Sequence, residues 1–220
     1  MSEPAAITLA MMREHLYSAV VCDALDALGF PRQAADAPLR PWTGATRLVG
    51  RCRTTRWEDL EGPDPRPYEL ELRAVDACRP GEVLICAASG SLKSGIWGEL
   101  LSTAARNQGC AGALVDGAVR DVARMRELGF PVWARGTSPR DSQHRQRVVE
   151  LDANVVIGGV TFEPGALVFA DEDGIVAVPR AVEADAIRRA WEKVHAENIT
   201  RQAIRDGMKA GEAWATYGVL

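Results

Sequence analysis

The chain has 220 residues, enough to bury roughly 70% of the surface that it exposes when unfolded, so we expect one domain spanning residues 1–220. Hydrophobic residues make up 47% and charged residues 25%, which are ordinary values for a soluble globular protein. The formal net charge of -4 argues against nucleic-acid binding, because nucleic-acid-binding surfaces carry a basic excess. No apolar run reaches the roughly 20 residues that cross a bilayer, and the N-terminus lacks a signal-peptide pattern. We therefore expect a cytoplasmic protein with small-molecule or protein partners and no membrane partner.

The five cysteines are odd in number, have no C-x-x-C spacing and lie in apolar surroundings. These features favour buried free thiols over disulfides or a zinc site. The three histidines are scattered along the chain and form no ligand cluster.

The first part of the chain is predicted to contain helices and strands in alternation. Ser18 can cap a helix over 18–28, which Gly29 then ends. The elements expected after it are a strand over 46–55, a charged, proline-rich loop over 58–67, a helix over 69–77 and a strand over 82–87.

The alternation continues through the middle of the chain. A loop over 89–97 precedes a predicted helix over 98–108, a strand over 111–115, a turn at Asp116-Gly117, a helix over 119–128 and a strand over 131–135. Strands that alternate with helices of about ten residues indicate βαβ units, so we predict the α/β class with a mixed or parallel sheet and helices packed on it.

The last third of the sequence is predicted to begin as a β-rich part with strands over 148–160, 166–169 and 175–178. A long C-terminal helix over about 181–206 follows. The tail carries Trp214, Tyr217 and Leu220 with little to bury them locally. The segment 181–220 can therefore pack on a neighbouring subunit, and a frayed tail is the alternative.

The stretch from Gly95 to Arg135 contains the candidate site. Both of its predicted helices start at the carboxyl edge of the sheet, where open α/β sheets bind ligands. At the first helix, Gly98 leaves room for a ligand, and the amides of Glu99, Leu100 and Leu101 can point at an anion.

At the second helix, Arg120 offers a planar fork of donors for a carboxylate, and Asp121 offers a hard oxygen ligand for Mg²⁺ or Mn²⁺. The pair fits a metal-bound keto acid. The alternative is that Asp121 only caps its helix and Arg120 is a solvated surface residue.

Twenty residues separate Glu99 from Arg120, and Asp121 follows directly. This pattern resembles the acid-x20-Arg-Asp signature of the 4-hydroxy-4-methyl-2-oxoglutarate aldolase family, whose superfamily also contains the regulator of ribonuclease activity A. The similarity extends over most of the chain, through SAVVCDALDALG, RPGEVLICAASG, FPVWARGTSP and PGALVFADEDGIVAVP.

The resemblance implies a fold like that of phosphohistidine swivelling domains, an α/β/α sandwich, and a homo-oligomer that is a trimer or a hexamer. It implies that Arg120, Asp121 and Glu99 are catalytic, and that Asp121 is the direct metal ligand. Gly98, Glu99, Leu100, Leu101 and Arg120 would bind the substrate. Glu99 stands where family members more often have aspartate, and the longer side chain puts its water-mediated contact with the metal in question.

The activity implied is that of a class II, divalent-metal-dependent pyruvate aldolase. Its substrate would be a 4-hydroxy-2-oxo acid such as 4-hydroxy-4-methyl-2-oxoglutarate or 4-carboxy-4-hydroxy-2-oxoadipate, cleaved to pyruvate and a second keto acid. Arg120 and the metal would stabilise the enolate, and a metal-linked water positioned by Glu99 is the candidate base. Decarboxylation of oxaloacetate could use the same enolate.

Other hypotheses stay open at this point. Lys93 could form a Schiff base, although nothing apolar around it would lower its pKa. Arg135 or Arg140 could meet a second substrate carboxylate. Asp171 and Asp173 could bind a metal, but an Asp-Gly sequence between apolar runs favours a turn. From another functional class, the chain could be a non-enzymatic regulator that binds a ribonuclease.

Overall fold

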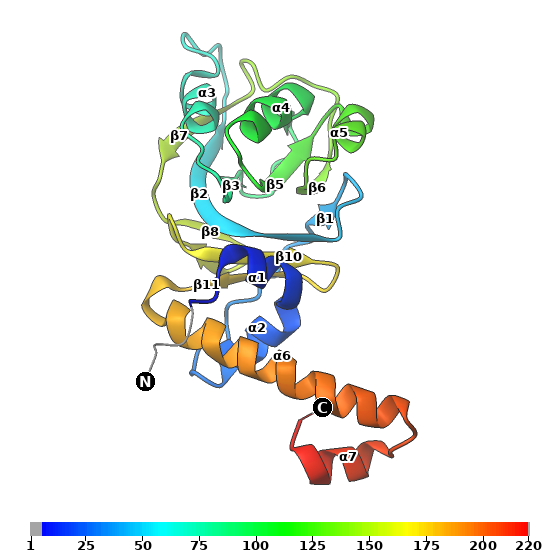
Figure 1. The fold of residues 1–220 in the computed structure, drawn as a ribbon. Helices are drawn as coiled ribbons and strands as arrows, with labels where there is room; N and C mark the ends of the chain where they lie inside the picture. Colours follow the sequence, from blue (N-terminus) through cyan, green and yellow to red (C-terminus); the bar gives the residue numbers. More distant parts are fainter. Residues whose placement is uncertain (1–5, 220) are drawn as a thin grey trace.

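The computed structural model describes residues 6–219, with helices on both sides of a curled mixed sheet (Figure 1). Its helices are α1 (Leu9–His15), α2 (Ser18–Asp26), α3 (Glu69–Asp76), α4 (Glu99–Asn107), α5 (Val122–Leu128), the 3-10 helix η1 (Arg180–Val182), α6 (Glu183–Arg205) and α7 (Ala210–Tyr217). Its strands are β1 (Arg40–Pro41), β2 (Arg47–Asp59), β3 (Glu82–Ala87), β4 (Gly95–Trp97), β5 (Gly112–Val119), β6 (Val132–Thr137), β7 (Gln146–Leu151), β8 (Val155–Ile157), β9 (Val160–Phe162), β10 (Leu167–Asp171) and β11 (Ile175–Val178). The predicted α/β class with a long C-terminal helix is confirmed.

The main sheet has the order β1-β6-β5-β3-β2-β10-β11. Strands β2, β3, β5 and β6 are parallel to one another, whereas β1 is antiparallel to β6 and β10 is antiparallel to both β2 and β11. Strand β4 pairs with β5, β7 pairs with β2, and β8 forms a separate hairpin with β9. The predicted βαβ part and the predicted β-rich C-terminal part are therefore joined through the long strand β2.

The sheet curls so that its strands are buried on both faces. In β3, Leu84 and Cys86 pack under α3, α4 and α5, whereas Val83 and Ile85 face the inside of the curl. In β10, Phe169 packs against α1, α2 and α6. Its neighbours Val168 and Ala170 face the inside of the curl, as Val83 and Ile85 of β3 do. Continuous apolar runs such as EVLICA are typical of strands covered on both sides.

Several predicted boundaries are wrong. Residues Asp116 and Gly117, predicted as a turn, lie inside β5, which continues to Val119. Asp116 is buried and its carboxylate is paired with Arg135 of β6. The N-cap of α2 is Tyr17 rather than Ser18. Ser18 instead donates hydrogen bonds to Asp171 through its backbone N–H at 2.7 Å and its hydroxyl at 2.5 Å.

Four of the five cysteines are buried as predicted, and Cys22 is partly exposed. Within residues 6–219, no helix combines the length and the apolar character that crossing a membrane requires.

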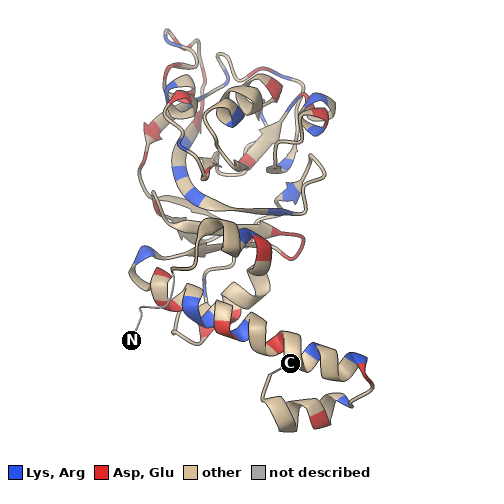
Figure 2. Ribbon diagram, viewed as in Figure 1, with Lys and Arg blue, Asp and Glu red and all other residues tan. Residues whose placement is uncertain are grey.

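The C-terminal arm consists of the second half of α6 together with α7, and it extends beyond the rest of the molecule in Figure 1. The first half of α6 packs against α2 through Ala190 and Val194. Acidic and basic residues alternate along α6 in Figure 2, so this helix carries no stripe of a single charge. On α7, Trp214 is 56% exposed and Tyr217 is 39% exposed, as the sequence suggested. Leu220 lies outside the described residues.

Candidate active site

The candidate site lies where the parallel strands β4 and β5 end. Gly98 is the N-cap of α4, and Asp121 is the N-cap of α5. Arg120 lies between β5 and α5, and its backbone N–H donates to the carbonyl of Trp97 at 2.8 Å. This bond joins the two strand ends, so the residues that follow each of them face the same space.

Close backbone packing fixes these two strand ends. A Cβ atom on Gly95 would lie 2.6 Å from the carbonyl oxygen of Ser138 and 2.9 Å from the Cβ of Arg120. A Cβ atom on Gly98 would lie 2.7 Å from a carboxylate oxygen of Asp121. Real Cβ contacts are not that short, so only glycine fits at position 95, where the Cβ would meet backbone. At position 98 a Cβ would displace the end of the Asp121 side chain.

A cavity of about 270 Å³ opens at this point. It is lined by apolar and backbone surface together with a few convergent polar side chains, which is the usual character of a ligand site. The lining residues are Tyr68, Glu71, Leu72, Gly95, Ile96, Trp97, Gly98, Leu100, Leu101, Arg120, Asp121 and Ser142.

Arg120 is held by two acidic residues. Its Nη1 donates to Oδ2 of Asp141 at 2.7 Å, and its Nε lies 3.7 Å from Oδ2 of Asp121. Asp141 also accepts a hydrogen bond at 2.5 Å from the hydroxyl of Tyr68, which precedes α3. Arg120 is therefore a half-buried, oriented cation rather than a freely solvated surface side chain.

Asp141 and Tyr68 have shifted pKa values that follow from these contacts. Partial burial alone would raise the pKa of Asp141, but hydrogen bonds from Tyr68, the backbone of Gln143 and Arg120 outweigh it and lower the pKa. Burial, followed by the hydrogen bond to Asp141, raises the pKa of Tyr68 to about 12. Asp141 is thus charged and Tyr68 neutral near neutral pH.

Asp121 adopts the left-handed conformation, with φ 56°, and its side chain makes no capping hydrogen bond to α5. The hypothesis that it serves only as a helix cap is therefore not supported by the geometry. Its carboxylate is exposed at the rim of the cavity. Among residues 6–219, no group of three or more His, Cys, Asp or Glu side chains gathers around it as a complete metal site.

Of the residues at the start of α4 that were predicted to bind the substrate, all but Glu99 line the cavity. Gly98, Leu100 and Leu101 line the cavity, and Leu100 is 75% exposed at its mouth. Glu99 is not among the lining residues, and its carboxylate accepts a hydrogen bond from Thr103 at 2.9 Å. The first N–H groups of α4 have no acceptor within the helix and remain available to an anion.

Glu71 is the unexpected member of the lining. It lies on the inner face of α3, is only 7% exposed, and accepts no hydrogen bond from any described residue. Burial, together with the charge of Asp141, raises the pKa of Glu71 to about 8, while Arg120 opposes the shift.

Sequence reasoning missed Tyr68, Glu71, Asp141 and Ser142. A signal for Glu71 was present, because it shares a helical face with the buried residues Ala74 and Val75, where an acid is out of place. Asp141 had no such signal. It reaches Arg120 because the loop that follows β6 is held at Gly95, whose N–H donates to the carbonyl of Arg140 at 2.9 Å.

Five other residues singled out in the sequence lie elsewhere. Lys93 donates to the carbonyl of Leu60 at 2.6 Å, and neither it nor Arg135 nor Arg140 lines the cavity. Asp171 forms the predicted turn by accepting from the backbone of Asp173 at 3.1 Å and holds Ser18 at the start of α2.

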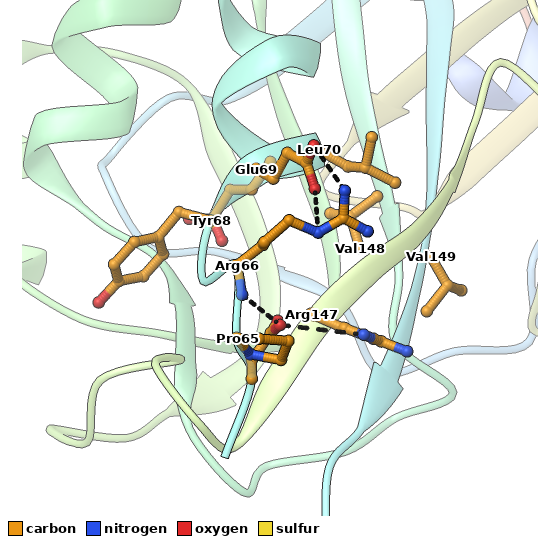
Figure 3. A pocket seen from close by; sticks show the side chains of 10 residues that line it. Pro65, Arg66, Tyr68, Glu69, Leu70, Arg147, Val148 and Val149 are labelled. Carbon is orange, nitrogen blue, oxygen red and sulfur yellow. Dashed lines mark hydrogen bonds and ion pairs between the residues drawn. The ribbon is translucent and has the colours of Figure 1, made fainter.

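A second cavity, of about 230 Å³, lies on the other side of the start of α3 (Figure 3). Apart from Glu71, which also lines it, its charged side chains are paired with each other: Arg66 with Glu69 at 3.2 Å and Arg147 with Asp64 at 3.9 Å. The side chain of Tyr68 points away from these pairs in Figure 3. This cavity therefore offers a ligand fewer free charges than the cavity beside Arg120.

Comparisons with known proteins show which family and which fold this chain is similar to. A family model described as "RraA-like: Aldolase/RraA" matches residues 18–177. A protein of Halalkalibacterium halodurans, named as a candidate 4-hydroxy-4-methyl-2-oxoglutarate aldolase, is 28% identical over 88% of this chain and 87% of its own length.

Two solved structures of similar fold carry a different description. Streptomyces coelicolor RraAS2, an unusual member of the RNase ES inhibitor RraA protein family, is 30% identical with a TM-score of 0.78, covering 91% of this chain and 98% of that chain. The RNA-processing inhibitor RraA from Thermus thermophilis is also 30% identical, with a TM-score of 0.61, covering 72% of this chain and 92% of that chain.

Proposed function

Since this chain belongs to the RraA-like family (Aldolase/RraA), we propose that it is a lyase that cleaves a 4-hydroxy-2-oxo acid to pyruvate and a second keto acid. Candidate substrates are 4-hydroxy-4-methyl-2-oxoglutarate, named for the Halalkalibacterium relative, and 4-carboxy-4-hydroxy-2-oxoadipate. The observation that carries the proposal is the convergence of Arg120, Asp121 and the first amides of α4 on one cavity.

The residues present fit a divalent cation. Mg²⁺ and Mn²⁺ prefer oxygen ligands, and Mg²⁺ commonly keeps several waters while binding one or two carboxylates and the substrate. Asp121 offers such a carboxylate at the rim of the cavity, where its Oδ2 lies against Gly98, which has no side chain to displace it. We propose that Asp121 holds the cation, which when bound would polarise the keto group of the substrate.

Arg120 has the geometry to bind the carboxylate of the 2-oxo acid. Its hydrogen bond to Asp141 uses Nη1 and its Nε faces Asp121 at 3.7 Å, so Nη2 is the nitrogen left for the substrate. The guanidinium group of Arg120 would also face the negative charge that develops on the keto oxygen as the carbon–carbon bond breaks. Donors that are already oriented stabilise such charge most effectively.

The walls of the cavity complete the site. Trp97, Ile96 and Leu101 exclude water from one side, and a drier site strengthens the attraction between Arg120 and an anionic substrate. The amide N–H groups at the start of α4 can donate hydrogen bonds to the second carboxylate of the substrate. We propose that Glu99 acts on the site indirectly, by fixing the first turn of α4 through Thr103.

Decarboxylation of oxaloacetate is a second reaction that the same site would support. Loss of CO2 from the β-carboxylate leaves the enolate of pyruvate, which is the species that aldol cleavage also forms. Arg120 would stabilise its charge in both reactions.

The direct test is release of pyruvate from 4-hydroxy-4-methyl-2-oxoglutarate, coupled to lactate dehydrogenase, with Mg²⁺ or Mn²⁺ and after chelation. We expect activity that chelation abolishes and added metal restores. Borohydride in the presence of pyruvate should leave the enzyme active, because Lys93 does not line the cavity. Inactivation by borohydride would instead support Schiff-base chemistry.

A second candidate function is regulation of a ribonuclease, which the descriptions of the Streptomyces and Thermus structures suggest. A regulator of this kind would bind and inhibit its ribonuclease without metal or keto acid. Absence of pyruvate release across a panel of 4-hydroxy-2-oxo acids, together with such inhibition, would favour this function over the lyase.

A further inference from the structure

Glu71 combines three properties that a purely structural residue would not show. It is 7% exposed, it lines the same cavity as Arg120 and Asp121, and no described residue donates a hydrogen bond to its carboxyl group. The carboxyl oxygens of Glu71 are not among the fully buried unpartnered atoms of the described residues, so they reach the cavity, where an acid in largely apolar surroundings costs stability. A group retained in that state is a candidate for function.

The other titratable groups that line the cavity cannot easily carry a proton near neutral pH. The hydroxyl of Tyr68 is engaged with Asp141. Arginine keeps its proton in proteins, so Arg120 cannot act as a base. Asp121 is the proposed ligand of the cation. Glu71 is therefore the remaining acid or base among the residues that line the cavity.

We propose that Glu71 is the proton carrier of the lyase reaction, taking the proton from the 4-hydroxyl of the substrate and returning it to C3 of the pyruvate enolate. This assignment rests on the proposed function and replaces the water near Glu99 that the sequence suggested as base.

The atoms and electrons balance within this single transfer. The Glu71 carboxylate accepts the hydroxyl proton while the O–H electron pair forms the new carbonyl of the leaving keto acid. The C3–C4 bond breaks, and its electron pair forms the enolate. The Glu71 carboxylic acid then donates its proton to C3, which yields pyruvate and regenerates the carboxylate.

The surroundings of Glu71 suit this role. The charged groups that act on it are Asp141, which favours the protonated form, and Arg120, which favours the carboxylate. On its other side, Glu71 also lines the cavity of Arg147 and Asp64, where those two residues are paired with each other. With a pKa of about 8, both forms of Glu71 are populated near neutral pH, as efficient acid–base catalysis requires.

Glu71→Gln tests the proposal, because it keeps the shape of the side chain and removes its ability to titrate. Glu69→Gln is the matched control on the same helix, since Glu69 is exposed, pairs with Arg66 and does not line the cavity beside Arg120. Three rates are compared in each protein: cleavage of the 4-hydroxy-2-oxo acid, exchange of the methyl protons of pyruvate with D2O followed by NMR, and decarboxylation of oxaloacetate.

We expect Glu71→Gln to lower cleavage and methyl-proton exchange by about 100-fold or more, the usual size of a lost acid–base group. Decarboxylation should persist, because loss of CO2 needs no base and water can protonate the enolate. In the wild type and in Glu69→Gln, kcat/KM for cleavage should rise with pH and level off near 8, whereas this bend should be missing in Glu71→Gln.

The outcomes separate the two proposals. Near-normal cleavage and exchange in folded Glu71→Gln would overturn the role of Glu71 and leave the lyase function intact. Equal loss of all three activities would also overturn it, because it would indicate a damaged site rather than a missing proton carrier. A wild-type protein that neither cleaves, exchanges nor decarboxylates would overturn the proposed function and this inference with it.

Discussion

Arg120 and Asp141 are 21 residues apart in the sequence, yet Nη1 of the arginine lies 2.7 Å from Oδ2 of the aspartate. Asp141 comes from the loop after β6, whereas Arg120 follows β5. The hydroxyl of Tyr68 donates to the other oxygen of the same carboxylate, at 2.5 Å. Three separate segments thus orient one guanidinium group toward the cavity.

Asp141→Asn should therefore impair the enzyme even though Asp141 is not expected to touch the substrate. We expect kcat/KM to fall by about 10- to 100-fold, the equivalent of about 1.5–3 kcal/mol for a hydrogen bond to a charged group. Steady-state kinetics on the folded variant would measure this. Asp152→Asn is the control, since Asp152 pairs with Arg53 at 3.0 Å and does not line the cavity. A loss of equal size in that variant would argue against orientation of Arg120.

Arg120 and Asp121 should fail in different ways when substituted. Asp121→Asn keeps its shape but loses its charge, so metal affinity should drop and excess Mg²⁺ should partly restore turnover. Arg120→Lys keeps its charge but loses the fork, so about 3 kcal/mol of transition-state stabilisation should be lost and added metal should not restore it.

A metal titration of the kinetics of both variants distinguishes these two failures, with circular dichroism as the folding control. Arg124→Lys on the exposed face of α5 should behave as the wild type. Activity close to the wild-type value in either site variant would place the site elsewhere.

Glu71 should make the stability of the protein depend on pH. Its pKa is raised from 4.5 to about 8 in the folded state, mainly by burial, so the unfolded chain releases this proton at lower pH than the folded chain does. The stability contributed by the neutral form is complete below pH 4.5 and is lost as pH rises toward 8.

Glu71→Gln removes this dependence. Relative to the wild type, the variant should therefore gain stability with rising pH, by up to about 4 kcal/mol in the free energy of unfolding. Denaturant unfolding of both proteins at pH 5, 7 and about 8.5 would measure the difference. A difference that is constant with pH would mean that Glu71 is not a protonated, buried acid.

The C-terminal arm should join subunits. We propose that the chain forms a single domain whose last part, about 181–220, packs on a neighbouring subunit in a trimer or hexamer. Replacing both Trp214 and Tyr217 by alanine should lower the mass measured by light scattering, because these exposed aromatic rings would lose their contact area. Glu212→Gln on the same helix should leave the mass unchanged. A wild-type monomer at micromolar concentration would contradict the proposal.

The order of helices and strands could be predicted from the sequence because most of it depends on local patterns. The apolar run EVLICA and the helix that lies between Gly98 and Gly109 are such patterns, and they occur where expected. The turn at Asp116-Gly117 failed, because a buried ion pair with Arg135 allows an aspartate to continue inside β5. Arg135 is distant in sequence, so no local pattern could show that compensation.

The candidate site was also predictable only where it depends on local sequence patterns. Arg120, Asp121 and Gly98 belong to two strand–helix junctions that the parallel sheet brings together, and their meeting followed from the expected topology. Glu71 and Asp141 arrive from α3 and from a loop, whose positions depend on the packing of the whole molecule. The direction of the Glu99 side chain was also not readable from spacing alone.

The residues that line the cavity differ in how freely they can change during evolution or design. Gly95 leaves no room for a larger residue, because a Cβ there would meet backbone. Leu72 and Leu100 are 49% and 75% exposed, so their size can change without moving the backbone. Efforts to alter which keto acid the protein accepts should therefore begin at Leu72 and Leu100, where shape can be varied while the groups around Arg120 stay in place.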